Sequence, residues 1–259
     1  MSQDWTNWDK AAWHYHQFVD SRADKLRTEL LYPALLGLEK KWQKKLVLDI
    51  GCGNGFFAKE LANNGASVWA FDGPQMITLA KQSFSDKHIT YAVHDATEQF
   101  PYESDFFDII TCNLVAMDML DITGMLAESR RVLKPEGRLL ITVLHPCFTP
   151  PVGKFRRGLL GRINQKWAYF QLKSYFQARK VSKKQLWPEG PETNYYHRSI
   201  GTYSAAFAAN DFTIKQMYEP IANETFLAQY PEYFHAKSIA IFLIFELIAT
   251  APLSHKAGL

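Results

Sequence analysis

The most informative stretch of the chain reads Val47-Leu48-Asp49-Ile50-Gly51-Cys52-Gly53-Asn54-Gly55. It begins in an apolar run that ends at glycines, a pattern typical of a buried parallel strand. Glycines at 51, 53 and 55 allow the backbone to turn sharply and to approach a ligand closely. The stretch therefore predicts a strand, a tight turn and a binding site in succession.

Two kinds of ligand can be considered for this turn. The dinucleotide fingerprint G-x-G-x-x-G requires glycine at position 56, where Phe56 stands. Asp49 would also repel a pyrophosphate, whereas it would attract a ligand with a cationic amino-acid tail. The pattern therefore favours S-adenosylmethionine, with S-adenosylhomocysteine as its product, over a nicotinamide or flavin cofactor.

Two further carboxylates follow the next strands. Asp72 lies about twenty residues beyond the turn, where a carboxylate can accept both hydroxyls of a ribose. The alternative is that Asp72 caps the following helix. Asp95 can accept a hydrogen bond from the exocyclic amine of adenine, and the alternative is an ordinary turn residue. We favour the ligand-binding role for both.

Apolar runs and helical patterns alternate through the central part of the chain. The expected strands are 46–50, 67–71, 89–93, 107–112 and 138–144, and the expected helices are 56–63, 75–84 and 124–133. This alternation predicts a doubly wound parallel sheet of the α/β class. A helix at 199–210 and two strands at 212–218 and 238–248 follow, and we expect these strands to pair antiparallel.

This ordered set of motifs resembles the class I S-adenosylmethionine-dependent methyltransferases, in particular the methyltransferase-11-like, ubiquinone-biosynthesis type that acts on small molecules. The resemblance depends on residues 47–77, Asp95 and the turn at 133–139, and it is strong over about residues 45–145. It implies a Rossmann-like seven-stranded sheet with an antiparallel last strand, and methyl transfer by in-line displacement. Ala70 and Gly73-Pro74-Gln75 depart from the family's usual glycine and serine.

The resemblance also implies the ligand-binding residues. The methionyl end would lie against Asp49 and the loop 51–55, with the ribose and the adenine at the next two strand ends and the reacting sulfur at the fourth. An early tyrosine would close over the methionyl group, with ordinary aromatic packing as the alternative. The expected cofactor residues are Tyr15, Asp49, Gly51, Cys52, Gly53, Gly55, Asp72, Gly73, Met76, Asp95, Ala96, Asn113, Leu114 and Val115.

Two segments outside the core are expected to form lids. Residues 1–40 have the pattern of an N-terminal helical lid, which Pro33 would break in two. Residues 146–196 carry no Asp or Glu from Pro146 to Pro188, but ten Lys or Arg between Lys154 and Lys184, interleaved with aromatic residues. We predict a basic, helical lid inserted after the fifth strand, which leaves 41–145 and 197–259 for the core.

Methyl transfer from a sulfonium releases a neutral thioether, so it needs no strong catalytic motif. His145 directly follows the fifth strand and is a candidate base or positioning residue, with turn formation as the alternative. His197 and Tyr196 could reach the same pocket from the inserted lid, or could begin a helix with aromatic packing. Asp118 could contact the acceptor or cap the next helix, and we favour the cap.

Composition and cysteine spacing indicate the compartment in which the protein is expected. The 259 residues are 47% hydrophobic with a formal net charge of +3, as in soluble globular proteins. Three cysteines lack metal-binding spacing, which predicts no metal site and a reducing compartment. We recognise no signal peptide and no membrane span, so we expect the protein in the cytoplasm.

The basic insertion is the main clue to the acceptor. It favours a small molecule that is anionic or aromatic. A nucleic-acid methyltransferase is disfavoured, because Asn113-Leu114-Val115-Ala116 replaces the Pro-Pro-aromatic motif of such enzymes. A non-catalytic S-adenosylmethionine-binding protein and a weak contact with a membrane surface are open alternatives. The sequence does not specify the oligomeric state.

Overall fold

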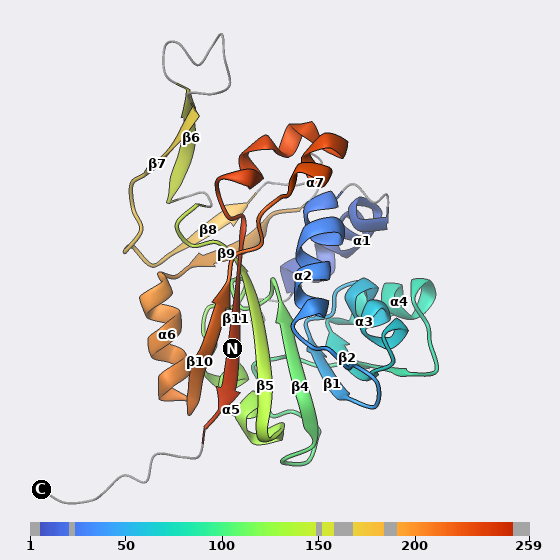
Figure 1. The fold of residues 1–259 in the computed structure, drawn as a ribbon. Helices are drawn as coiled ribbons and strands as arrows, with labels where there is room; N and C mark the ends of the chain where they lie inside the picture. The colour runs from blue at the N-terminus through green and yellow to red at the C-terminus, as the bar shows by residue number, and fades with distance from the viewer. Residues whose placement is uncertain (1–5, 21–23, 149–151, 158–167, 184–190, 251–259) are drawn as a thin grey trace, which may run out of the picture.

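A seven-stranded sheet runs through the molecule in the order β10-β11-β5-β4-β1-β2-β3 (Figure 1). All neighbouring strands are parallel except β11, which lies antiparallel to both β5 and β10. This confirms the predicted α/β sheet with its antiparallel last strand. The strands are β1 (Leu46–Ile50), β2 (Ser67–Asp72), β3 (Ile89–Val93), β4 (Phe107–Asn113), β5 (Leu133–Leu144), β10 (Phe212–Tyr218) and β11 (Phe242–Ala249).

The structure is a computed structural model that describes residues 6–20, 24–148, 152–157, 168–183 and 191–250. Within these residues no helix has both the length and the apolar character needed to cross a bilayer.

Helices cover both faces of the sheet. Alternate residues of β1 face opposite sides, so Leu48 and Ile50 pack in one core cluster and Val47 in the other. The first cluster takes in α5 (Thr123–Val132) and α6 (Ile200–Ala209). The second includes residues of α3 (Phe56–Asn63), α4 (Pro74–Ser83) and the N-terminal α2 (Tyr32–Gly37). The carboxyl ends of the parallel strands thus meet at one edge, which holds the site.

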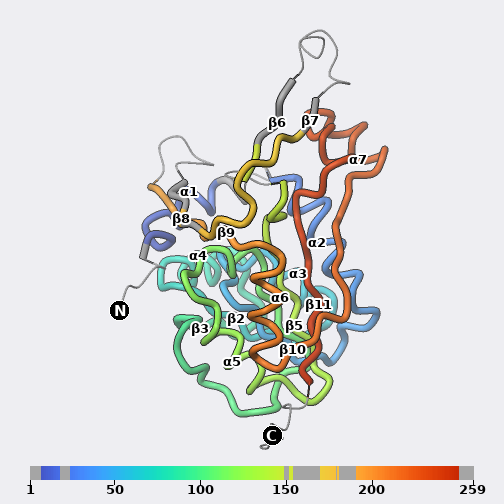
Figure 2. Tube along the Cα trace, turned by 90° about the vertical axis from the view of Figure 1, so that its left-hand side faces the viewer, coloured from blue at the N-terminus to red at the C-terminus, as the bar shows by residue number. Residues whose placement is uncertain are grey.

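The segment after β5 differs from the prediction. It forms two antiparallel hairpins, β6 (Gly153–Arg157) with β7 (Ala168–Leu172) and β8 (Arg179–Lys183) with β9 (Thr193–His197), so the expected helical lid is wrong (Figure 2). The aromatic residues that we placed on helices favour strands, and residues 155 and 170 are paired across the first hairpin. The predicted positions 149–151, 158–167 and 184–190 lie outside the described residues.

The N-terminal segment is helical as expected, but Pro33 does not interrupt it. Helix α1 (Thr6–Asp20) is followed, after the non-helical Asp24, by a π-helix, η1 (Leu26–Leu31), that continues directly into α2. Pro33 sits in the first turn of α2, where a missing N–H costs little. Helix α1 packs against α4 and β9.

A small cap precedes the last strand. Asn223 accepts a hydrogen bond from the Phe226 N–H (2.8 Å) and begins α7 (Glu224–Gln229), after which residues Pro231–Lys237 form a 3-10 helix, η4. These turns postpone β11 to Phe242, four residues later than the strand expected from position 238.

Candidate functional site

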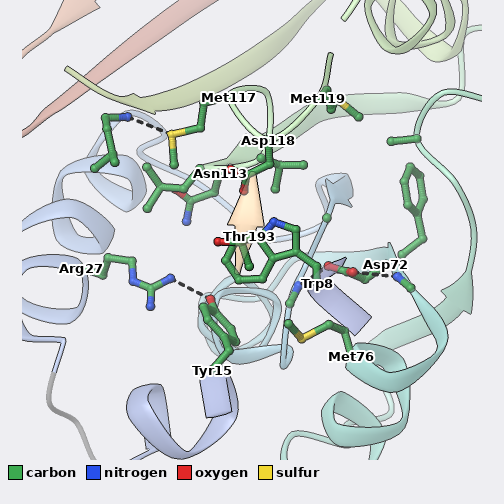
Figure 3. A pocket seen from close by; sticks show the side chains of 18 of the residues that line it. Trp8, Tyr15, Arg27, Asp72, Met76, Asn113, Met117, Asp118, Met119 and Thr193 are labelled. Atoms are coloured by element: carbon green, nitrogen blue, oxygen red, sulfur yellow. Dashed lines mark hydrogen bonds between the residues drawn. The ribbon is translucent and has the colours of Figure 1, made fainter. Parts of the chain in front are cut away.

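A cavity of about 490 Å³ lies at the carboxyl edge of the parallel strands (Figure 3). Open α/β sheets bind their ligands at this edge. The ends of β1, β2, β3 and β4 form its floor, and α1 with β9 lies on the opposite side. The lining includes the expected Tyr15, Gly51, Gly53, Asp72, Gly73, Met76, Asp95, Ala96, Asn113, Leu114 and Val115.

The turn after β1 packs tightly against Phe71, Val115 and Tyr15. Gly51 has a φ of +66°, and its N–H donates to the Phe71 carbonyl (2.9 Å). A Cβ at Gly51 would lie 2.5 Å from a methyl of Val115, and one at Gly53 would lie 3.3 Å from the Tyr15 ring. Only glycine therefore fits at position 51, for conformation as well as for space.

Asp72 connects this turn to the end of β2. Its two carboxylate oxygens accept the N–H groups of Gly53 and Gly73, each at 2.7 Å. Burial raises the pKa of Asp72 to about 6, despite these hydrogen bonds. The N-cap of α4 is Gly73, so the sequence alternative that Asp72 caps this helix is wrong.

Asp49 lies behind the turn and is 1% exposed. Its Oδ1 accepts a hydrogen bond from the Thr111 hydroxyl (2.7 Å), whereas its Oδ2 has no partner among the described residues. Burial raises the pKa of Asp49 to about 7, with a further contribution from the charge of Asp72. Asp49, Cys52 and Gly55 are not among the described residues that line the cavity.

Asp95 forms a turn at the edge of the cavity. Its Oδ1 accepts hydrogen bonds from the N–H and the hydroxyl of Thr97 (2.9 and 2.8 Å), which makes it a turn residue. It also lines the cavity together with Ala96. A carboxylate has a second oxygen, so the turn does not prevent ligand binding.

The loop after β4 carries backbone strain at the cavity. Leu114 has a φ of +61°, in the left-handed region that residues with a Cβ avoid, and its N–H donates to Thr142 (3.0 Å). The neighbouring Asn113 Oδ1 is buried and has no partner within the described part of the chain. This geometry presents Asn113 and Val115 to the same space as the glycine turn.

The N-terminal part of the chain lines one side of the cavity, and two of its lining residues, Trp8 and Arg27, were not predicted from the sequence. Arg27 of η1 is 8% exposed; it donates to the Tyr15 hydroxyl (2.7 Å) and pairs with Asp24. Trp8 lies edge-on to Tyr15 with ring centroids 5.7 Å apart. A tryptophan-rich N-terminus was the only sequence signal for this wall, because nothing in the local pattern connects Arg27 with Tyr15.

Comparison with known proteins finds matches to the core of the chain. Residues 48–141 match the methyltransferase domain family. The chain is 32% identical over 161 residues to a demethylmenaquinone methyltransferase of Deinococcus radiodurans, covering 56% of this chain and 63% of that protein. It is 30% identical over 102 residues to a ubiquinone biosynthesis O-methyltransferase of Xanthomonas oryzae pv. oryzae, covering 38% and 43% of the two chains. Over residues 48–141 the chain is therefore similar to methyltransferase domains, in agreement with the resemblance that the sequence motifs indicated.

The fold is shared with solved structures over most of the chain. A solved S-adenosylmethionine-dependent methyltransferase from Mesorhizobium loti superposes with a TM-score of 0.70 at 22% identity, covering 83% of this chain and 96% of that one. The likeness therefore extends beyond the matched family segment. The chain spans less than two thirds of the length of the two curated relatives.

The three candidate catalytic residues lie outside the described cavity lining. His145 is 3% exposed; its Nε2 lies 2.8 Å from Glu219 Oε1, and its Nδ1 accepts the Cys147 N–H (3.1 Å). Both ring nitrogens are thus engaged, and burial lowers the pKa of His145 although Glu219 opposes this. This placement favours the turn-forming alternative.

Tyr196 and His197 are buried at the end of β9. The Tyr196 N–H donates to the Met117 carbonyl (2.7 Å), and His197 Nε2 lies 2.7 Å from the Tyr175 carbonyl. Ser199 then caps α6 through the Thr202 N–H. The residue of this hairpin that does line the cavity is Thr193, which the sequence did not single out.

The N-cap of α5 is Ile122, four residues beyond Asp118, so the favoured prediction that Asp118 caps this helix is wrong. Asp118 lines the cavity instead. Asp121 Oδ1 accepts the Thr123 N–H (2.9 Å) in the turn that leads into α5. The described residues hold no group of three or more His, Cys, Asp or Glu that could bind a metal ion.

Proposed function

We propose that this chain transfers a methyl group from S-adenosylmethionine to a small-molecule acceptor. One observation carries the proposal: a single cavity brings together the glycine turn, the Asp72 carboxylate and the Asp95 carboxylate, which leave three successive parallel strands. A nucleoside attached to an amino acid needs these three kinds of contact, in this order along the sheet edge.

The chemistry of the described residues fits this group. S-adenosylmethionine, when bound, supplies a methyl carbon whose leaving group is a neutral thioether. Asp72 would accept the ribose hydroxyls and Asp95 the adenine amine. Asp49 Oδ2 is buried without a partner among the described atoms, and a cationic amino group nearby would favour its ionised form. Because Gly51 lacks a Cβ, the Val115 side chain packs directly on the turn, which brings the loop after β4 beside the turn after β1.

The residues of the chain would act mainly by alignment. The Gly51 turn, Asn113 and Val115 line the cavity together, and Trp8, Met117 and Phe242 are among its apolar lining residues. An apolar enclosure excludes water and suits a reaction whose charge disperses. Alignment of the acceptor with the methyl carbon would supply most of the acceleration.

A small acceptor fits the cavity and the relatives better than nucleic acid does. The two relatives are named for demethylmenaquinone and for ubiquinone biosynthesis, and the loop after β4 begins Asn113-Leu114-Val115 without a Pro-Pro-aromatic motif. The cavity is also covered on one side by Trp8 and Tyr15 of α1, which leaves limited room for a base attached to a polymer.

Calorimetry with S-adenosylhomocysteine tests the donor site directly. The wild type should bind, and D72N should bind at least about tenfold more weakly, because the amide cannot accept both ribose hydroxyls and the charged hydrogen bonds are lost. D105N is the matched control, since Asp105 is an exposed turn residue with a φ of +57° that Asn tolerates. The absence of binding by the wild type would refute the proposal.

Incubation with labelled S-adenosylmethionine and a metabolite extract, followed by mass analysis, tests the transfer. We expect a small product heavier by one methyl group. Donor binding without any such product, over many extracts, would favour a non-catalytic binding protein. A labelled nucleic acid fraction would favour the polymer acceptor instead.

A further inference from the structure

The loop between β4 and α5 forms one whole wall of the cavity. Five consecutive residues line it: Met117, Asp118, Met119, Leu120 and Asp121. The donor contacts proposed above come from other segments, namely the turn after β1, the ends of β2 and β3, and residues 113–115. Figure 3 shows Met117, Asp118 and Met119 of this loop at the cavity. The loop 117–121 is thus the part of the lining that remains for an acceptor.

Arg198 holds this loop from behind. Its guanidinium donates to three backbone carbonyls, those of Ala116 (3.1 Å), Met119 (2.5 Å) and Leu120 (2.7 Å). The Tyr196 N–H adds a fourth bond, to the Met117 carbonyl (2.7 Å). The chain leaving β9 thus fixes the backbone of the loop at four consecutive or near-consecutive positions.

Position 198 requires an arginine side chain to hold the loop. Arg198 is only 9% exposed, and it is absent from the described cavity lining, so it acts through the loop and not on a ligand. A planar guanidinium can donate in several fixed directions at once, whereas a lysine ammonium cannot span three carbonyls in one plane. The position therefore requires the shape of arginine and not merely a positive charge.

The charges along the wall indicate the kind of acceptor. Asp118 and Asp121 are the two carboxylates of the wall. Asp121 Oδ1 accepts the N–H and the hydroxyl of Thr123 (2.9 and 2.7 Å) in the turn that leads into α5. Asp118 lies between Met117 and Met119 in the chain, and all three line the cavity. A carboxylate has two oxygens, so contacts within the protein do not prevent a further hydrogen bond to a ligand. An anionic acceptor would be repelled here, whereas an N–H or O–H group would be oriented by hydrogen bonding.

We propose that residues 117–121 form the acceptor wall, that Asp118 accepts the N–H or O–H of the acceptor's nucleophilic group, and that Arg198 is the positioning residue of this wall. The inference rests on the proposed methyl transfer. It assigns an uncharged or cationic, largely apolar acceptor, in contrast to the anionic one that the basic insertion alone suggested. Proton loss from the nucleophile would be directed to the Asp118 carboxylate.

R198K tests the positioning role against a matched control, R130K. Arg130 also donates to a backbone carbonyl, that of Thr250 (3.1 and 2.7 Å), but α5 holds it away from the described cavity lining. The probe is the extract fraction that the wild type methylates. For R198K we expect the apparent KM for this fraction to rise about tenfold or more, since small displacements of a binding wall are costly. The KM for S-adenosylmethionine should change less than about twofold, and R130K should resemble the wild type.

Hydrogen exchange of the apo protein provides a readout that needs no acceptor. R198K should exchange faster over residues 115–122 while the β1 and β2 amides stay protected. D118N should keep wild-type exchange and wild-type S-adenosylhomocysteine binding, but lose methylation of the fraction about tenfold or more.

Two results would overturn the inference while leaving the proposed function intact. One is an equal change of both KM values in R198K, which indicates a general structural role. The other is unchanged methylation in D118N. Failure of the wild type to bind S-adenosylhomocysteine is a distinct outcome that refutes the proposed function itself.

Discussion

The buried carboxyl group of Asp49, beside the glycine turn, makes the folding stability depend on pH. The carboxyl group is 1% exposed, and burial raises its pKa to about 7 from an ordinary value of 3.8. Between these values the folded chain keeps a proton that the unfolded chain has lost. Folding stability from this group is therefore present below about pH 4 and falls as the pH rises to about 7.

D49N removes this pH dependence. The free energy of unfolding of the wild type should decrease from pH 5 to pH 8 by up to about 3 kcal/mol from this group, and D49N should show a smaller decrease. The new amide group in D49N is buried and costs the same free energy at every pH, so comparing the pH change within each protein cancels this cost. Urea unfolding at four pH values measures the free energy of unfolding of the wild type, D49N and the control D105N. An identical slope in D49N and the wild type would contradict the pKa assignment.

Gly51 is the second residue whose identity has a measurable consequence. Alanine there must adopt a φ of +66° and place its Cβ 2.5 Å from Val115. G51A should lose about 2 kcal/mol or more of unfolding free energy and should not bind S-adenosylhomocysteine. G37A is the matched control, since a Cβ at Gly37 meets no described atom within 4 Å and the helix favours alanine. Equal stability of the two variants would show that the turn relaxes.

At the scale of elements, Glu246 joins three strands. This residue of β11 is 1% exposed, and its carboxylate accepts hydrogen bonds from Arg138 of β5 (3.0 Å), Lys215 of β10 (2.9 Å) and Tyr218 of β10 (2.7 Å). Burial acts to raise the pKa of Glu246, but the three donors outweigh it and the pKa is lowered. This single charge in an otherwise apolar strand thus binds the polar side chains of both neighbouring strands.

E246Q should weaken this edge in a pH-dependent way. At pH 7 we expect a loss of about 2–3 kcal/mol, because Arg138 and Lys215 lose their shared counter-charge. The lowered pKa means that the wild type keeps this stability above about pH 4.5 and loses it as the pH falls, so the two proteins should converge in acid. K215M, which changes a half-exposed partner, should cost less than about 1 kcal/mol. A larger loss in K215M than in E246Q would contradict this ordering.

The elements that the sequence predicted well are those with a strong local pattern. β1, α3, β3 and β10 have the expected bounds, because apolar periodicity, glycines and flanking turns all agree there. The inserted hairpins were missed, since aromatic residues between lysines fit a helix face and a strand equally well. The Arg27–Tyr15 contact and the clamp by Arg198 were also missed, because tertiary packing alone brings these segments together.

At the scale of the whole molecule, the topology of the sheet determines where a ligand can bind. Parallel strands from both sides of β1 end at one edge, and α1, which packs on β9, closes over this edge. The proposed donor residues lie mostly within one segment, 51–115, so their motifs were visible in the sequence. The remaining lining residues come from α1, the loop 117–121, β9 and the start of β11, among other segments, which are widely separated along the chain.

Ligand binding should therefore stabilise the molecule as a unit. S-adenosylhomocysteine at a hundred times its Kd should add about 2.7 kcal/mol to the unfolding free energy, which for a chain of this size raises Tm by roughly 5–10 °C. NAD at the same concentration should leave Tm unchanged, because the Asp72 carboxylate beside the turn disfavours a pyrophosphate and Phe56 occupies the position of the third fingerprint glycine. Differential scanning calorimetry on the wild type and D72N measures both effects. A shift of equal size with NAD would contradict the donor assignment, and a shift that survives in D72N would show that the ribose carboxylate lies elsewhere.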